Sequence, residues 1–186
     1  MASLDPKQTL LVIALAEESQ GLFENVGLQP LYTGLGSIKS TYSLTRAIFD
    51  LKPKMILNLG TAGSFRLPQG VAVECSAFVQ RHLAEKCLPS KKIITSNYLT
   101  DLPKAICGTA DHIEHSLDPL KQTFYDIMDM EGYALAYVAQ QSKIPFHSVK
   151  FVSDNSGQDV FLNWKCNLPA AAKNLFQVYQ KITERY

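Results

Sequence analysis

The sequence predicts an α/β protein with a largely parallel central sheet. Short apolar runs alternate along the chain with segments of helical periodicity, which is the pattern of strands joined by crossover helices. The first apolar run, Thr9–Leu15, is continuous, as is typical of a strand buried on both faces. The 186 residues contain no internal repeat, low-complexity segment or long linker. We therefore expect one domain spanning residues 1–186.

The first half of the chain predicts three strands and two helices. After the first strand, a short helix is expected at Glu17–Val26 and a second strand at Leu28–Thr33. The second strand ends in the sequence TGLGS, and a helix from about residue 38 to 51 follows it. The third strand, Met55–Leu59, is expected to run into a turn of small residues with the sequence GTAG.

The second half is less regular at its start. Residues 70–80 are strand-like, and residues 92–95 and 105–108 are short strand candidates, whereas residues 112–128 contain a proline and have no clear period. A helix at Glu131–Ser142 has apolar residues along one side. A strand at Phe146–Val152 and a terminal helix from Pro169 to Glu184, which has a periodic apolar face, complete the predicted order.

Composition excludes several classes of function. The chain carries 18 basic and 17 acidic residues without a basic block, so nucleic acid is not an expected partner. No apolar run approaches the length of a membrane span. The N-terminal apolar piece, Leu10–Ala16, lacks the flanks of a signal peptide, so we expect a cytoplasmic protein. The four cysteines, Cys75, Cys87, Cys107 and Cys166, have no metal-ligand spacing and are expected to be reduced thiols; no metal site is predicted.

Acidic residues and glycines follow several of the predicted strands. Ligands of parallel sheets bind outside the carboxyl ends of the strands. Glu18, the two glycine-containing turns and Asp154 stand at such ends, and Glu131 stands at a helix start. Each also has a structural explanation, since helix dipoles favour acids in the first turn and aspartate is common in turns. In combination they indicate one pocket.

Five segments occur in the order found in a known superfamily: LLVIALAEE, TGLGSIKST, LNLGTAGSF, DMEGYALAYVAQQSKIPF and VKFVSDNSG. On these segments the chain resembles the nucleoside phosphorylase/nucleosidase superfamily. The resemblance is strongest to its hydrolytic branch, typified by 5′-methylthioadenosine/S-adenosylhomocysteine nucleosidases. It implies a three-layer α/β/α sandwich around a central mixed, largely parallel sheet, and a small-molecule nucleoside as the binding partner.

The resemblance also implies roles for the acids. Glu131, in the Met-Glu motif, would bind the ribose hydroxyls, with Met130 packed against the sugar. Asp154 would protonate or hydrogen-bond purine N7 as the base leaves, with Ser153 beside it, and Glu18 would activate the attacking water. An acid at N7 neutralises the charge of the leaving base, and carboxylates near the sugar stabilise its oxocarbenium character.

Two further segments would complete the pocket. Thr61, Ala62 and Gly63 match the small-residue turn that lines the sugar and water site in this superfamily. The base-facing loop matches CGTADHIEH, which offers Asp111 and His112 to the base. His112 could stack on a base, form a hydrogen bond with it, or be an ordinary surface histidine.

The turn after the first strand separates two reactions. Phosphorylases of the superfamily hold phosphate with arginines in this turn, whereas ALAEES contains two carboxylates and no arginine. Two acids repel phosphate and suit neutral water, so the sequence favours hydrolysis of the N-glycosidic bond of a purine nucleoside resembling 5′-methylthioadenosine or S-adenosylhomocysteine. The alternatives are a phosphate-dependent phosphorylase and a catalytically inactive nucleoside-binding protein on the same fold.

The chain also departs from the superfamily pattern. It is shortened between about residues 66 and 107, a region that contributes to the base pocket and the subunit interface, and Lys150 stands where arginine is common. The resemblance implies a homodimer or higher homo-oligomer and no cofactor. Exposed aromatic residues such as Phe78 or Tyr98 could serve the interface, although Tyr98 could equally be an ordinary surface residue.

Overall fold

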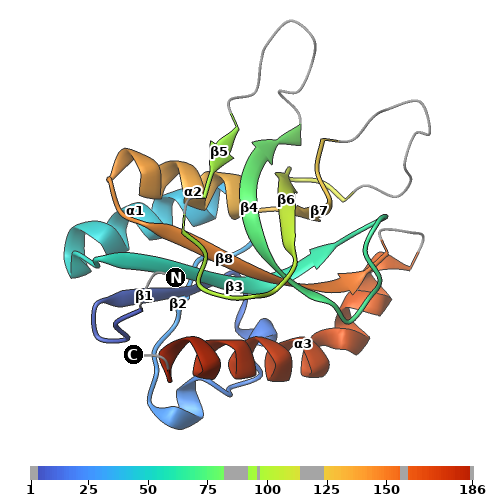
Figure 1. Ribbon diagram of the computed structural model, residues 1–186, viewed down its shortest axis with the longest axis horizontal. Helices are drawn as coiled ribbons and strands as arrows, with labels where there is room; N and C mark the ends of the chain where they lie inside the picture. Colours follow the sequence, from blue (N-terminus) through green and yellow to red (C-terminus); the bar gives the residue numbers. More distant parts are fainter. Residues whose placement is uncertain (1–3, 82–91, 96, 114–123, 156–158, 185–186) are drawn as a thin grey trace, which may run out of the picture.

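Eight strands form one mixed sheet in the computed structural model, which describes residues 4–81, 92–95, 97–113, 124–155 and 159–184 (Figure 1). The strands are β1 (Thr9–Ile13), β2 (Leu31–Tyr32), β3 (Met55–Gly63), β4 (Ala72–Gln80), β5 (Ile93–Ile94), β6 (Lys104–Thr109), β7 (Ile127–Asp129) and β8 (Phe146–Asp154). The helices of the described residues are α1 (Ser37–Leu51), α2 (Gly132–Gln141), α3 (Val160–Thr183) and the 3-10 helices η1 (Ala16–Glu18) and η2 (Glu24–Val26).

The sheet has the order β2-β1-β3-β7-β6-β4-β5, and β8 pairs with both β3 and β4. Strand pairs β1–β2, β1–β3, β3–β8, β4–β6 and β6–β7 are parallel, whereas β3–β7, β4–β5 and β4–β8 are antiparallel. The predicted mixed, largely parallel sheet is therefore confirmed. The two pairings of β8 also close β3, β7, β6, β4 and β8 into a ring, which the sequence did not predict.

Helices cover both faces of the sheet. Successive side chains of a strand point to opposite faces, so apolar side chains on each face pack against helices. Leu10 and Val12 belong to the core cluster that contains residues of α1 and α2. Leu11 and Ile13 belong to the cluster that contains residues of α3. Figure 1 shows α1 and α2 on one side of the sheet and α3 on the other. The predicted three-layer α/β/α arrangement is confirmed.

The segment after β1 is not the single helix expected at Glu17–Val26. It forms η1 and η2, two short 3-10 helices. Between them Gln20 and Gly21 adopt left-handed conformations, with φ of 49° and 72°. A left-handed residue cannot continue a right-handed helix, so the chain is interrupted there.

The GTAG segment is not a turn. Residues 60–63 continue β3, and Gly60, Thr61 and Ala62 pair with β8 before the register shifts at Gly63, which pairs with Asp154. The prediction that the strand ended at Leu59 was wrong because small residues can be core as well as turn. Here Gly60 leaves room for the buried side chains of Glu18 and Lys150.

Helix α3 begins at Val160, nine residues before the predicted start at Pro169. A proline inside a helix cannot donate to the carbonyl four residues earlier, here that of Lys165. Both residues are exposed. Water can therefore take the place of the missing donor, and the helix continues through the proline.

Two other expectations concern aromatic and sulfur side chains. Phe78 is completely buried in a core cluster, so its assignment to a subunit interface was wrong. Cys75 and Cys107 are buried free thiols and Cys166 is an exposed one, whereas Cys87 lies outside the described residues. None of the helices in the described parts of the chain is long and apolar enough to span a membrane.

Candidate active site

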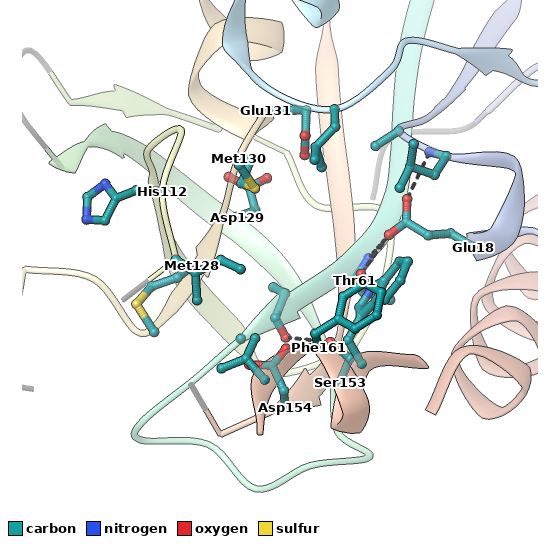
Figure 2. A pocket seen from close by; sticks show the side chains of 18 of the residues that line it. Glu18, Thr61, His112, Met128, Asp129, Met130, Glu131, Ser153, Asp154 and Phe161 are labelled. Carbon is teal, nitrogen blue, oxygen red and sulfur yellow. Dashed lines mark hydrogen bonds between the residues drawn. The ribbon is translucent and has the colours of Figure 1, made fainter. Parts of the chain in front are cut away.

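A cavity of about 230 Å³ opens where the carboxyl ends of β1, β3 and β8 meet the start of α3. Residues at the ends of β4, β6 and β7 complete its wall. Nine of the ten residues predicted for the site line it: Glu18, Thr61, Ala62, Gly63, His112, Met130, Glu131, Ser153 and Asp154. Figure 2 shows Glu18, Glu131 and Asp154 around the cavity on three different sides.

Glu18 ends η1 and is held by three donors. Its Oε1 accepts hydrogen bonds from the backbone N–H and the hydroxyl of Thr61, both at 2.7 Å, and its Oε2 accepts one from Leu15 N at 3.2 Å. The side chain is buried, although its neighbour Glu17 is exposed. The turn after β1 therefore turns one carboxylate toward the cavity and fixes its orientation.

The Thr61 hydroxyl has a second partner on α3. The indole Nε1 of Trp164 lies 3.0 Å from Thr61 Oγ1, and Trp164 itself lines the cavity. The sequence did not indicate this residue, because the predicted terminal helix began after it.

Asp154 ends β8 and is surrounded by contacts at the strand end. Ser153 Oγ donates to Asp154 Oδ2 at 2.9 Å, and Ser64 N donates to the Asp154 carbonyl at 3.0 Å. Asn167 of α3 donates through Nδ2 to the Ser153 carbonyl at 2.8 Å. The backbone that carries Asp154 is thus tied to both β3 and α3.

Glu131 precedes α2 and is buried. Its Oε1 accepts a hydrogen bond from Gly36 N at 2.8 Å. Burial and the nearby charge of Asp129 raise the pKa of Glu131 to about 8, against the opposing effects of Lys150 and the Gly36 N–H. The raised pKa favours the protonated form of Glu131 near neutral pH. In the GLG turn, Gly36 donates its backbone N–H to Glu131. Its φ of 92° is a conformation that favours glycine.

A buried ion pair, which the sequence did not predict, contributes one of its partners, Asp129, to the cavity wall. Lys150 Nζ lies 2.9 Å from Asp129 Oδ2. Asp129 also accepts hydrogen bonds from Thr109 Oγ1 at 2.6 Å and Gly132 N at 2.8 Å. Burial opposes the charge on both partners, but Lys150 holds the pKa of Asp129 below its usual value, and Asp129 holds that of Lys150 above its own.

Two glycines make room for these charges. A Cβ atom on Gly60 would lie 3.3 Å from Glu18 Oε1 and 3.4 Å from Lys150 Nζ. Both charged groups therefore pack closely against the Gly60 backbone. A Cβ atom on Gly132 would lie 2.7 Å from Asp129 Oδ2, closer than such contacts permit. The glycine after Met-Glu therefore allows the Asp129 carboxylate to cap the start of α2.

The base-facing loop is split between two environments. Asp111 is absent from the cavity wall, and its Oδ1 accepts a hydrogen bond from Ser37 N at 2.7 Å at the start of α1. His112 lines the cavity but is exposed, and its carbonyl accepts a hydrogen bond from Arg81 Nη2 at 3.0 Å. The role of His112 toward a base stays a prediction.

The sequence contained signals for some of the missed residues. Asp129 directly precedes the Met-Glu motif, but it ends a three-residue strand that begins within the segment without a clear period. Trp164 is the only tryptophan of the chain. Among the described residues no group of three or more histidine, cysteine or acidic side chains could hold a metal ion.

The chain is similar in sequence to known proteins. Residues 105–184 match the family model described as the phosphorylase superfamily. The 5′-methylthioadenosine/S-adenosylhomocysteine nucleosidase of Bacillus velezensis is 25% identical over 210 aligned positions, which cover 97% of this chain and 90% of the relative.

Two solved structures from Helicobacter pylori have the same fold. Its 5′-methylthioadenosine/S-adenosylhomocysteine nucleosidase, complexed with a substituted pyrrolidinol compound, has a TM-score of 0.84 at 19% identity and covers 96% of this chain and 99% of its own. Its native futalosine hydrolase has the same TM-score and identity and covers 96% and 98%.

Proposed function

This chain belongs to the nucleoside phosphorylase/nucleosidase superfamily, and from that premise we propose that it is a nucleosidase, which hydrolyses the N-glycosidic bond of a purine nucleoside. The observation that carries the proposal is the placement of Glu18 and Asp154, which line one cavity from the ends of different elements. Both carboxyl groups are buried and held by hydrogen bonds. Two such carboxyl groups can assist cleavage of the N-glycosidic bond from its two sides. One activates the attacking water, and the other donates a proton or hydrogen bond to the leaving purine.

Glu18 is assigned to the water. Its Oε1 already accepts two hydrogen bonds from Thr61, which orients the carboxylate toward the cavity. We assign it as the general base that takes a proton from water while the water oxygen attacks C1′ of the ribose. Thr61, Ala62 and Gly63 would line the place of attack.

Asp154 is assigned to the base. When the bond between C1′ and N9 breaks, its electron pair stays on the purine, and the developing charge is relieved by a proton or hydrogen bond at N7. Asp154 would supply it, with Ser153 Oγ holding Oδ2 at 2.9 Å. The products are the free base and the free sugar, and no cofactor takes part.

Glu131 is assigned to the ribose hydroxyls. Its Oε1 accepts from Gly36 N, so Oε2 is the oxygen that we assign to the sugar. Since burial and Asp129 raise the pKa of Glu131 to about 8, a neutral carboxyl group is available to donate as well as to accept. Met130 would pack against the sugar, and His112 against or beside the base.

The turn after β1 favours water over phosphate as the nucleophile. The cavity wall at this point presents the Glu18 carboxylate, which would repel a phosphate dianion. Arg81 is the one arginine among the described lining residues, and it lies at the end of β4. We therefore favour hydrolysis, and phosphorolysis is the alternative reaction that the experiment must test.

The test is a panel of nucleosides incubated with the protein, with and without phosphate, and analysed for free base by chromatography. The panel contains 5′-methylthioadenosine, S-adenosylhomocysteine, adenosine, inosine and futalosine. We expect phosphate-independent release from 5′-methylthioadenosine and S-adenosylhomocysteine. Release that requires phosphate would support a phosphorylase, and no release from any member would support a nucleoside-binding protein.

A single substitution tests the assigned mechanism. Asp154→Asn keeps the size of the side chain and removes the acid, so base release should be lost while the fold is retained. Circular dichroism and the unfolding midpoint provide the folding control. Unchanged turnover would contradict the assignment of Asp154.

An apolar stripe on α1 supports the proposed homodimer or higher homo-oligomer. Ile38, Tyr42 and Phe49 are 83%, 63% and 81% exposed, and their spacing of four and seven residues places them on one face of the helix. Leu35, just before α1, lines the cavity, so a second copy on this face would lie near the cavity mouth. We keep the cytoplasm as the proposed location.

A further inference from the structure

The single tryptophan of the chain is connected to a proposed catalytic side chain through hydrogen bonds. Trp164 lies in the second turn of α3, and its indole Nε1 is 3.0 Å from Thr61 Oγ1. The same Thr61 oxygen lies 2.7 Å from Glu18 Oε1. Trp164, Thr61 and Glu18 therefore form a continuous chain of hydrogen bonds from α3 through β3 to η1.

Donor and acceptor chemistry fixes the direction of this chain. An indole N–H can only donate, so Thr61 Oγ1 accepts from Trp164. An ionised carboxylate can only accept, so the one proton of the Thr61 hydroxyl points at Glu18. Trp164 thus occupies the lone-pair side of the hydroxyl and turns its proton toward the carboxylate.

We propose that Trp164 is a positioning residue for hydrolysis, which fixes the Thr61 hydroxyl and through it holds Glu18 Oε1 in the orientation that activates water. The inference rests on the proposed function of this cavity. Hydrogen bonds arranged in a chain polarise one another, so removing the first donor weakens the bond that reaches Glu18. Small errors in the position of a catalytic group reduce turnover strongly, so we expect turnover to depend on the hydrogen bond between Thr61 and Glu18.

A second donor on the same face of α3 supports this role. Asn167 lies three residues after Trp164 and donates to the Ser153 carbonyl at 2.8 Å. The two side chains tie α3 to β3 and β8, the strands that carry Thr61 and Asp154. Trp164 reaches a side chain that contacts Glu18, whereas Asn167 reaches only backbone.

A double-mutant cycle tests whether Trp164 acts through Thr61. Phenylalanine at position 164 keeps an aromatic ring and donates no hydrogen bond, and valine at position 61 keeps the shape of threonine without the hydroxyl. We expect Trp164→Phe to lower kcat about tenfold while KM changes less than about threefold. The variant loses the positioning of Glu18, the general base, but keeps the binding of the substrate.

The cycle is decided by the double variant. If the bonds form one unit, Trp164→Phe combined with Thr61→Val should be no slower than Thr61→Val alone. If the two losses multiply, Trp164 acts independently of Thr61 and the proposal is overturned. Leu162→Ala is the matched control, since Leu162 lies on α3, is 60% exposed and should leave kcat unchanged.

A spectroscopic test needs no turnover. Because the chain has one tryptophan, the 15N-labelled protein gives one indole N–H resonance. Thr61→Val should move this resonance toward the position of a free indole and speed its exchange with water, whereas Thr61→Ser should preserve both. An unmoved resonance in Thr61→Val would overturn the proposal. A wild-type protein without nucleosidase activity would instead overturn the proposed function and leave this measurement intact.

Discussion

Lys150 Nζ lies 2.9 Å from Asp129 Oδ2, and the two side chains are only 3% and 1% exposed. Asp129 lines the same cavity as the proposed ribose-binding residue, Glu131, and Lys150 lowers the pKa of both carboxyl groups. Asp129 in turn helps to keep Glu131 protonated. The charge state of the cavity wall thus depends on the pairing of Asp129 with the buried Lys150.

Removing one partner of this pair should destabilise the protein. Lys150→Met leaves a buried carboxylate without its counter-charge, and we expect a loss of about 3–5 kcal/mol in the free energy of unfolding. Urea denaturation measures it. Lys165→Met, at an exposed position of α3, is the matched control and should change the free energy by less than about 0.5 kcal/mol.

The double variant separates a missing charge from a missing side chain. Lys150→Met with Asp129→Asn leaves no isolated charge, so its loss should be smaller than the sum of the two single losses. Additive losses would show that the two side chains contribute separately and that the ion pair is not the stabilising unit.

Glu131 should make stability fall as pH rises. Its pKa is about 8 in the folded protein and near 4.5 when unfolded, so the folded state keeps a proton that the unfolded state releases between these values. A state that binds more protons loses stability with increasing pH, and here the loss extends from about pH 4.5 to about pH 8. Glu131→Gln cannot release this proton. Urea midpoints from pH 5 to 8 should therefore fall less steeply for the variant, and equal slopes would contradict the assignment.

Glu74 should act in the opposite direction at acid pH. Burial alone would raise its pKa, but His147, Lys104 and the donors of Leu99 and Thr100 lower it to about 2. A depressed carboxyl pKa stabilises the protein above the unfolded value, and this contribution is lost as pH falls from about 4.5 to about 2.

The acid limb of the stability curve tests this assignment. Glu74→Gln should be less stable than wild type near pH 7 and should lose less stability between pH 4.5 and 2. Thermal unfolding at several pH values measures both differences. Parallel curves for the two proteins would rule out Glu74 as a source of acid lability.

The stripe on α1 gives a prediction about assembly. Phe49 is 81% exposed, so Phe49→Glu costs little in the isolated subunit but places a charge in any interface formed by Ile38, Tyr42 and Phe49. We expect the wild type to be a dimer or larger and the variant to be a monomer by light scattering. Leu162→Glu is the control on α3 and should keep the wild-type mass. An oligomeric Phe49→Glu protein would place the interface elsewhere.

The sequence predicted the parts of the fold whose signals are local. The helix α1 and the helix after Glu131 have a helical period, and the strand ending near Asp154 is rich in valine and phenylalanine. Their order supports the α/β class. The acids at their ends were therefore found, and nine of the ten predicted residues line the cavity.

The remaining features depend on contacts between distant segments. The three-residue strand β7 is too short to show a period, so the position of Asp129 opposite Lys150 could not be predicted. The sequence predicts a helix start at Pro169, after Trp164, but Pro169 is exposed and tolerated inside α3, which therefore includes Trp164. The sequence predicts that Asp111 lines the cavity, but its carboxylate accepts a hydrogen bond from Ser37 N in the first turn of α1.

Glu18 and Glu17 provide the sharpest test of the proposed base. They are adjacent in η1, but Glu18 is buried on the cavity wall and Glu17 is exposed. Glu18→Gln removes the proton acceptor and keeps the shape, so kcat should fall by about 10²–10⁴ with little change in KM. Glu17→Gln removes the same charge from the neighbouring position and should leave kcat unchanged. Equal losses in both variants would mean that the turn contributes only its charge, and Glu18 would then not be the base.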